Sequence, residues 1–316
     1  MRINKFGKSD LYVPQLSFGG NVFGWTLDEK DSFKMLDELY DNGLTFIDTA
    51  NNYSYWAPGN VGGESEAIIG KWFKEHKKRH DIVLSTKVGG SMNEVSRGLS
   101  KEQIVQGVDA SLRRLNTDYI DVYFSHHDDL ETNQEETMES FNDLVKAGKV
   151  RYLGASNLEA DRISSSNALA KEKGWAEYIA IQPLYNLYDR VKYEQEYLPL
   201  VEKENLAVMS YFALASGFLS GKYRSLEDIE GSSRKDMVKG YINERGITIL
   251  NQCDAIAKQH NATIAEVAIT WQLHKPTIST PIVSATSSTQ LKSLVRSMEI
   301  KLSVEEVALL DKASVY

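Results

Sequence analysis

Cysteine, proline and long apolar runs are scarce in this chain of 316 residues. It has a single cysteine, Cys253, and six prolines. One cysteine cannot form a disulfide within the chain, and such low usage is typical of proteins in a reducing compartment. No run of about 18 uncharged apolar residues occurs, and the start MRINKFGKSD has no apolar stretch of signal-peptide length. We therefore expect a cytoplasmic protein without a membrane-spanning helix.

Clustered positive charge is also missing. The formal net charge is -8, and the lysines and arginines are spread along the chain. This distribution argues against nucleic acid or an anionic membrane surface as a partner. An anionic ligand would have to be bound by a local group of donors.

What the chain does have is a repeated alternation of β-rich runs with helix-period segments. The chain is 42% hydrophobic and 25% charged, as is usual for globular proteins. Its length suits either two conventional domains or one large barrel. The eight β-rich runs cover 16–20, 44–48, 81–87, 119–126, 150–157, 178–183, 206–211 and 279–284.

Apolar residues at helical spacing fill the intervals between these runs. Ser100 with Gln103 forms a capping-box pattern at the start of one helix, and Gly148 follows the end of the next. The predicted helices span 31–42, 64–77, 101–115, 135–147, 159–173, 193–204, 247–260, 264–274 and 291–298.

Strands that are apolar on both faces, each followed by a helix, indicate a parallel sheet covered on the outside. A doubly wound sheet is the alternative, but the turn GGNVFG after the first strand lacks a G-x-G-x-x-G fingerprint. We therefore predict an α/β fold, a (β/α)8 TIM barrel in one domain over residues 1–316. A hairpin over Arg2 to Val13 would close its amino end. The long polar loop from Lys222 to Tyr241 is of a kind that is often functional.

Four polar residues follow strand ends, where parallel barrels place their active sites. These residues are Asp48, Tyr53, Lys87 and His126. Taken singly, each has an ordinary reading as a turn cap, a packed ring, a solvated lysine or a satisfied polar group. Taken together, a lysine held by an aspartate would lower the pKa of the tyrosine from about 10, so that it could donate a proton near neutral pH. The histidine would orient the oxygen that is protonated.

The order and spacing of several motifs resemble the aldo-keto reductase superfamily. The resemblance runs from about Gly19 to Leu310. Its motifs are D-T-A-x-x-Y at 48–53, S-T-K at 85–87, Y-I-D-V-Y-F-S-H-H-D-D at 119–129, G-A-S-N at 154–157, Q-P-x-Y-N at 182–186 and S-Y-F-A-L-A-S-G-F-L-S-G-K-Y at 210–223.

This resemblance implies an oxidoreductase that passes hydride from NADPH, or NADH, to the carbonyl carbon of a small aldehyde or ketone. It assigns proton donation to Tyr53. Lys87, paired with Asp48, would lower the pKa of Tyr53, and His126 would position the substrate oxygen. The carboxamide of the nicotinamide would be held at the strand ends, its ring would stack on Tyr211, and the pyrophosphate would follow Leu214 to Lys222. The implied cofactor-binding residues are Gly20, Ser156, Asn157, Gln182, Tyr211, Leu214, Ser216, Gly217, Lys222, Ser284, Thr286 and Gln290.

The chain departs from the family pattern after the last strand. Ser284, Thr286 and Gln290 lie where the family often has an arginine or lysine for the 2′-phosphate. Their hydroxyl and amide groups bind a phosphate less strongly than a guanidinium group does, so we expect NADP, with NAD as the alternative. Trp25, Trp56 and His127 are candidate walls of the substrate pocket, with ordinary packing as the alternative.

Two other functions remain as alternatives. The sequence H-H-D-D at 126–129 could be read as a metal cluster, but neighbouring strand residues point to opposite sides, so we expect no metal. The second alternative is a nucleotide-binding regulatory subunit or redox sensor of the same fold with slow turnover.

Overall fold

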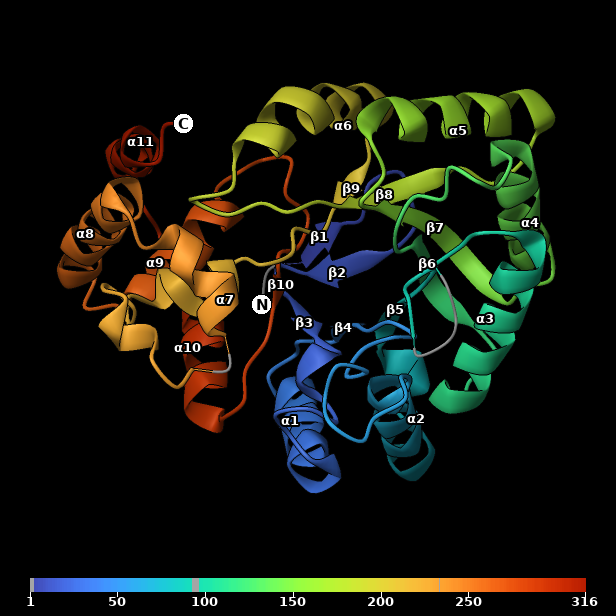
Figure 1. Cartoon of the computed structure of the whole chain (residues 1–316), viewed down its shortest axis with the longest axis horizontal. Helices are drawn as coiled ribbons and strands as arrows, with labels where there is room; N and C mark the ends of the chain where they lie inside the picture. Colours follow the sequence, from blue (N-terminus) through green and yellow to red (C-terminus); the bar gives the residue numbers. More distant parts are fainter. Residues whose placement is uncertain (1–2, 93–96, 233) are drawn as a thin grey trace.

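The computed structural model describes residues 3–92, 97–232 and 234–316. Eight parallel strands occupy the centre of the molecule, and helices surround them (Figure 1). The strands are β3 (Ser17–Gly19), β4 (Phe46–Asp48), β5 (Val83–Val88), β6 (Ile120–Ser125), β7 (Val150–Ser156), β8 (Tyr178–Gln182), β9 (Ala207–Val208) and β10 (Ile282–Val283).

The sheet curls so that its first and last strands meet. Its order is β10-β3-β4-β5-β6-β7-β8-β9, and every ladder is parallel. Backbone hydrogen bonds from Thr280 N to Val208 O, 3.2 Å, and from Ile282 N to Ser210 O, 2.8 Å, join the two outer strands. These bonds complete the curl, and the arrangement agrees with the predicted (β/α)8 barrel rather than with a doubly wound sheet.

Helices cover the outer face of the sheet. The α-helices are α1 (Glu29–Asp41), α2 (Glu64–His76), α3 (Lys101–Leu115), α4 (Gln134–Lys146), α5 (Ala160–Lys173), α6 (Leu198–Glu204), α7 (Lys235–Val238), α8 (Glu244–Gln259), α9 (Ile264–Leu273), α10 (Ser288–Ser297) and α11 (Val304–Ala313). Shorter turns are η1 (Gly20–Val22), η2 (Arg79–Asp81), the π-turn η3 (Tyr193–Tyr197), η4 (Ala215–Ser220), η5 (Glu227–Ile229) and η6 (Lys239–Tyr241).

Local sequence explains where several helices begin and end. The Ser100 hydroxyl accepts from Gln103 N, and the Gln103 side chain bonds back to Ser100, so the predicted capping box is confirmed. Gly148 follows α4 at φ +73°, a left-handed conformation that glycine adopts without strain.

An antiparallel hairpin lies across the centre of the ring in Figure 1. It consists of β1 (Ile3–Lys5) and β2 (Tyr12–Pro14), with Lys5 opposite Tyr12. Phe6 and Val13 of this segment pack with Phe46, Phe124 and other buried side chains of the strands. The hairpin thereby fills one end of the barrel, as predicted for the amino end, although Arg2 lies outside the described residues.

All eight predicted strands are present, and the predicted helices are matched to within a few residues. The helices α7 and α11 were not predicted. Within the described residues, no helix combines the length and the apolar character needed to cross a membrane.

Candidate active site

Three of the four strand-end residues meet in one buried cluster. Asp48 ends β4, and its ladder partner in β5 is Ser85. Lys87 lies two residues after Ser85, so its side chain is on the same face of the sheet. The Lys87 ammonium donates to Asp48 Oδ2 at 2.6 Å, to the Thr49 carbonyl at 2.8 Å and to Tyr53 Oη at 2.8 Å. The Tyr53 hydroxyl donates to Asp48 Oδ2 at 3.2 Å. The phenol, ammonium and carboxylate thus form a closed triangle of hydrogen bonds.

The carboxylate of Asp48 also accepts two further hydrogen bonds on its other oxygen. Ser85 Oγ and Gln182 Nε2 each donate to Oδ1 at 2.7 Å. Asp48 has no exposed surface, and Lys87 is 1% exposed. A buried carboxylate is stable only when it is paired and hydrogen-bonded, and both conditions are met here.

The expected lowering of the Tyr53 pKa is wrong for this structure. Burial, followed by the charge of Asp48 and the hydrogen bond to it, raises the pKa of Tyr53 well above 10. Burial also lowers the pKa of Lys87, while Asp48 opposes that change. The physical reason is that the positive charge of Lys87 is offset by Asp48, so the carboxylate and the loss of water determine the state of the phenol.

His126 lies beside this cluster and is fixed by its backbone. Its N–H donates to the Val88 carbonyl at 2.8 Å, and its carbonyl accepts from Asn157 Nδ2 at 2.8 Å. The imidazole and the Tyr53 ring are 6.2 Å apart between centroids. Burial, and then the charge of Lys87, lower the pKa of His126 well below its usual value. The ring is therefore neutral at neutral pH.

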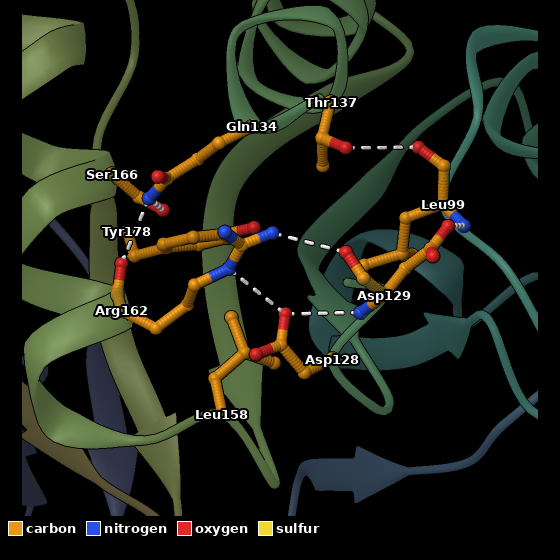
Figure 2. A pocket seen from close by; sticks show the side chains of 9 residues that line it. All are labelled: Leu99, Asp128, Asp129, Gln134, Thr137, Leu158, Arg162, Ser166 and Tyr178. Atoms are coloured by element: carbon orange, nitrogen blue, oxygen red, sulfur yellow. Dashed lines mark hydrogen bonds and ion pairs between the residues drawn. The ribbon is translucent and has the colours of Figure 1, made fainter. Parts of the chain in front are cut away.

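Asp128 and Asp129, which follow His126 and His127 in the chain, are held by Arg162, as Figure 2 shows. Arg162 of α5 donates to Asp128 Oδ1 at 3.1 Å and to the Asp129 carbonyl at 3.0 Å. The Asp129 carboxylate accepts from Leu99 N at 2.7 Å and from Thr132. The cavity among these side chains is about 10 Å³, room for about one water molecule. It is a packing gap, and the side chains around it are joined by hydrogen bonds.

The same contacts bear on the metal reading of H-H-D-D. The rings of His126 and His127 stack on each other at 4.8 Å, whereas Asp128 and Asp129 bind Arg162 and backbone groups. In the described parts of the chain, no group of three or more His, Cys, Asp or Glu side chains is arranged to hold a metal ion.

The residues predicted to hold a nicotinamide lie together at the ends of β7 and β8. Ser156 Oγ donates to the Gln182 carbonyl at 3.0 Å, and Asn157 Nδ2 donates to Ser156 Oγ at 3.1 Å. The Tyr211 hydroxyl donates to Asn157 Oδ1 at 2.9 Å. The Gln182 amide links this group to Asp48 through the bond given above. These polar groups are prepositioned by one another, next to the triangle.

A sharp turn follows Tyr211. From Leu214, the chain turns through Ala215, Ser216 and Gly217, which have φ values of +47°, +58° and +99°. Non-glycine residues in this region each cost roughly 1–3 kcal/mol, so such a run points to a functional constraint. Successive left-handed residues can turn backbone N–H groups toward an anion.

Two cations flank this turn, and only one of them was found from the sequence. A Cβ built on Gly217 would lie 3.8 Å from both Lys222 Cε and Arg234 Nη1. Arg234 also donates to the Ser216 carbonyl at 3.3 Å, and its guanidinium lies 5.8 Å from the Trp25 ring centre. Neither cation forms an ion pair with any residue that the structure describes. The only sequence signal for Arg234 was its place in the polar loop from 222 to 241.

The predicted residues after the last strand form hydrogen bonds with nearby groups. Ser284 Oγ donates to the Gly19 carbonyl at 2.9 Å, next to buried Gly20, which begins η1. Thr286 donates through its N–H and its hydroxyl to Gln290 Oε1. Their polar atoms are engaged locally, at the start of α10.

The candidate pocket walls form an aromatic group above Tyr53. The rings of Trp25 and Trp56 meet edge to face at 5.6 Å, and Trp56 lies 6.2 Å from Tyr53. Trp56 is 46% exposed, far more than a packed core side chain. His127, the third candidate, is half-buried. Burial, and then the positive charge of Arg97, lower the pKa of His127 to about 4.

Comparisons with known proteins identify the family of this chain. The model of the Aldo/keto reductase family matches residues 15–315. An uncharacterized oxidoreductase of Bacillus subtilis, YrpG, is 33% identical over 98% of this chain and 95% of its own length. A probable voltage-gated potassium channel subunit beta of Arabidopsis thaliana is 32% identical over 95% and 92%. The versiconal hemiacetal acetate reductase of Aspergillus parasiticus is 30% identical over 99% and 96%. The chain belongs to the aldo/keto reductase family.

Proposed function

We propose that this protein reduces the carbonyl group of an aldehyde or ketone with a nicotinamide cofactor, with Tyr53 as the proton donor. The observation that carries the proposal is the hydrogen-bonded triangle of Asp48, Lys87 and Tyr53 at the carboxyl end of the barrel strands. Active sites of this fold are built at that end. A phenol that keeps its proton, beside a buried ammonium, is suited to protonate an oxygen.

The donor set fits a reduced nicotinamide dinucleotide. Tyr211 offers a ring face and is tied to Asn157, while Ser156 and Gln182 supply hydroxyl and amide groups next to it. The turn at 214–217, with Lys222 and Arg234 beside it, offers cations and a strained backbone for a pyrophosphate. An acidic protein needs such a local positive region to bind this anion.

When bound, the cofactor supplies hydride to the carbonyl carbon. Tyr53 donates its phenolic proton to the carbonyl oxygen as the new C–H bond forms, and the resulting phenolate lies next to the Lys87 ammonium. Lys87 stabilises this phenolate, and Asp48 keeps Lys87 in place. Neutral His126 donates a hydrogen bond to the same oxygen. Solvent then returns a proton to Tyr53.

The aromatic group of Trp25 and Trp56 provides apolar walls for the substrate. We also propose NADP as the preferred cofactor. The cations Lys222 and Arg234 support binding of a dinucleotide. The hydroxyl groups of Ser284 and Thr286 would bind the 2′-phosphate. NAD is the alternative.

The experiment is a titration with NADPH and NADH by protein fluorescence, followed by a panel of aldehydes and ketones with the tighter-binding cofactor. The proposal predicts carbonyl-dependent oxidation of the cofactor at 340 nm, about where reduced nicotinamide absorbs. No turnover with any member, despite cofactor binding, would refute the enzymatic assignment.

That negative result would support a second function, a nucleotide-binding regulatory subunit. The relative from Arabidopsis thaliana named as a probable channel subunit beta favours this candidate. The intact triangle favours catalysis, because a sensor has no need for a proton donor at the carbonyl position.

A further inference from the structure

Several buried polar atoms have no hydrogen-bond partner among the described residues, and two of them belong to side chains that approach Gly90. These two atoms are Asn52 Oδ1 and His126 Nδ1. Leaving a buried polar atom without a partner costs about 1–3 kcal/mol, so each such atom calls for an explanation. Asn52 belongs to the loop after β4, and His126 directly follows β6.

Gly90, from the segment after β5, lies between these two side chains. A Cβ built on Gly90 would be 2.5 Å from Asn52 Nδ2 and 3.0 Å from His126 Nδ1. Real Cβ atoms essentially never show the first distance, and the second is tighter than most real Cβ contacts. The absence of a side chain at position 90 therefore lets the amide and the imidazole approach the same point.

The orientation of the Asn52 amide is set by its other neighbour. Its Nδ2 donates to the Ser91 carbonyl at 3.4 Å. An amide oxygen in that place would face another oxygen, so the NH₂ group is the end directed toward the space shared with His126. Its second hydrogen is available to the imidazole.

His126 needs such a partner because its neutral ring can carry its hydrogen on either of two nitrogens. Its backbone is fixed on both sides, and the charged or titratable groups around the ring are Lys87, His127, Arg97 and Tyr53. Burial, and then the neighbouring cations, keep the ring neutral by lowering its pKa. A neutral imidazole carries one hydrogen, on either Nδ1 or Nε2. Only the form with hydrogen on Nε2 can donate from that nitrogen while Nδ1 remains an acceptor.

We propose that Asn52 is a positioning residue that fixes the tautomer of His126. In the structure Asn52 Nδ2 approaches the same point as His126 Nδ1, which has no partner among the described residues. A small rotation of the amide would let Nδ2 donate to Nδ1, which would leave the hydrogen on Nε2 and make that nitrogen the donor. The inference rests on the proposed carbonyl reduction, since it gives the Nε2 hydrogen its use at the substrate oxygen. The proposed hydrogen bond requires neither cofactor nor substrate, so it can be tested in the free protein.

The first test reads the tautomer directly, without any turnover. The protein is labelled with ¹⁵N-histidine, and the His126 signals among the six histidines are assigned with His126→Gln. We expect the Nε2–H form in the unaltered protein. In Asn52→Asp, a carboxylate of nearly the same shape accepts from the ring, so the hydrogen moves to Nδ1 and the pKa of His126 rises. Unchanged His126 signals and an unchanged pKa in Asn52→Asp would overturn the proposal, as would an Nδ1–H form in the unaltered protein.

Two further variants separate the contact from the added charge. Asn52→Leu removes the donor without adding charge, and Gly90→Ala inserts a methyl group between the two nitrogens. Both should give His126 signals averaged between the two tautomers, while the other histidine signals stay in place and report an intact fold. A single Nε2–H form in both variants would contradict the proposal.

Kinetics provides the second readout. A donor misplaced at a developing oxyanion costs about 10²-fold in kcat, and we expect that loss in Asn52→Asp at pH values above the raised His126 pKa. Activity should return as the pH falls below that pKa, because a charged ring donates from both nitrogens. A loss that did not depend on pH would indicate general damage and contradict the tautomer mechanism. If the unaltered protein reduced no carbonyl, the NMR result would still decide the contact.

Discussion

At the scale of single residues, the buried pair of Asp48 and Lys87 dominates the energetics of the site. Asp48 accepts from Lys87, Tyr53, Ser85 and Gln182, so its charge is stable only while these donors remain. Removing one member of a buried ion pair leaves an uncompensated charge, which costs more than the pair is worth.

Lys87→Met should therefore lower the free energy of unfolding by about 3–5 kcal/mol, because Asp48 keeps a buried charge without its counter-ion. Urea unfolding measures the change. The matched control is the double variant Asp48→Asn with Lys87→Met, in which no charge is left buried. The double variant should be more stable than Lys87→Met alone. If the double variant lost as much free energy of unfolding as the sum of the losses in Lys87→Met and in Asp48→Asn, the pair would not be coupled.

The pH dependence of reduction follows from the raised pKa of Tyr53. The phenol keeps its proton at neutral and mildly alkaline pH, so the rate of the hydride-transfer step should be flat from about pH 6 to about pH 9 and fall only above about pH 10. The reverse oxidation requires the phenolate, and its rate should rise with pH over the same range. Single-turnover measurements isolate this step from product release. A reduction rate that fell between about pH 7 and pH 9 would mean that Lys87 lowers the phenol pKa after all.

The sequence was sufficient to predict that Asp48, Tyr53 and Lys87 would meet, because strand ends of a parallel barrel converge. It was insufficient for the pKa of Tyr53, which depends on burial and on the competition between Lys87 and Asp48 for the phenol. It also gave no signal for the closeness of Asn52, Gly90 and His126. That contact involves three separate strand ends and is set by backbone positions.

At the scale of elements, the turn within η4 is the most strained part of the candidate cofactor site. Gly217 has φ +99°, and a Cβ there would meet nothing closer than 3.8 Å. A substitution would therefore act through backbone strain rather than through a clash.

Gly217→Ala should weaken NADPH binding by roughly 10-fold, since about 1–2 kcal/mol of left-handed strain would shift the turn. Fluorescence titration measures this change. Gly174→Ala is the matched control, because Gly174 ends α5 at φ +68° with nothing within 4 Å of a Cβ. The control should lose stability but bind cofactor normally. Equal binding by both variants would remove the turn from the cofactor site.

The regular elements were predictable because apolar periodicity and caps reflect local physics. The strand β9 is shorter than the predicted run 206–211, since Met209 and Tyr211 continue by separate backbone bonds to Ile181 and Pro183. The helix α11 was missed although Ser303 and Glu306 form a capping box at its start. The short α7 lies in the polar loop, where periodicity gives little information over four residues.

At the scale of the whole molecule, the protein combines a net charge of -8 with a local pair of cations at one turn. The overall field would repel an anionic dinucleotide, so the proposed binding would depend on short-range contacts with Lys222 and Arg234. Such contacts weaken as salt screens them.

Lys222→Met and Arg234→Met should each raise the dissociation constant for NADPH by roughly 10-fold, because a charge-assisted hydrogen bond contributes about 1.5–3 kcal/mol, partly offset by solvent. Titrations at low and high salt measure both the affinity and its salt dependence, which should decrease in each variant. Lys235→Met is the control, since Lys235 is exposed and already paired with Glu230. Affinity equal to that of the unaltered protein in both test variants would place the dinucleotide elsewhere.

The barrel as a whole followed from the eightfold alternation and from the motif order, and the family match confirms it. Arg234 did not follow, because the path of a long loop between η4 and α8 depends on packing that no local pattern encodes. The local bonds of the hydroxyls after β10 did not follow from the sequence either, because they depend on how Gly19 and α10 pack against that segment.

The central claim is that Tyr53 protonates the carbonyl oxygen, and the most direct test is the single-turnover rate of NADPH oxidation by Tyr53→Phe. The ring and its packing against Trp56 are kept, and only the hydroxyl is removed. We predict a loss of about 10²- to 10⁴-fold with cofactor affinity unchanged. A Tyr53→Phe variant that binds NADPH normally and reduces carbonyls at the unaltered rate would contradict the account.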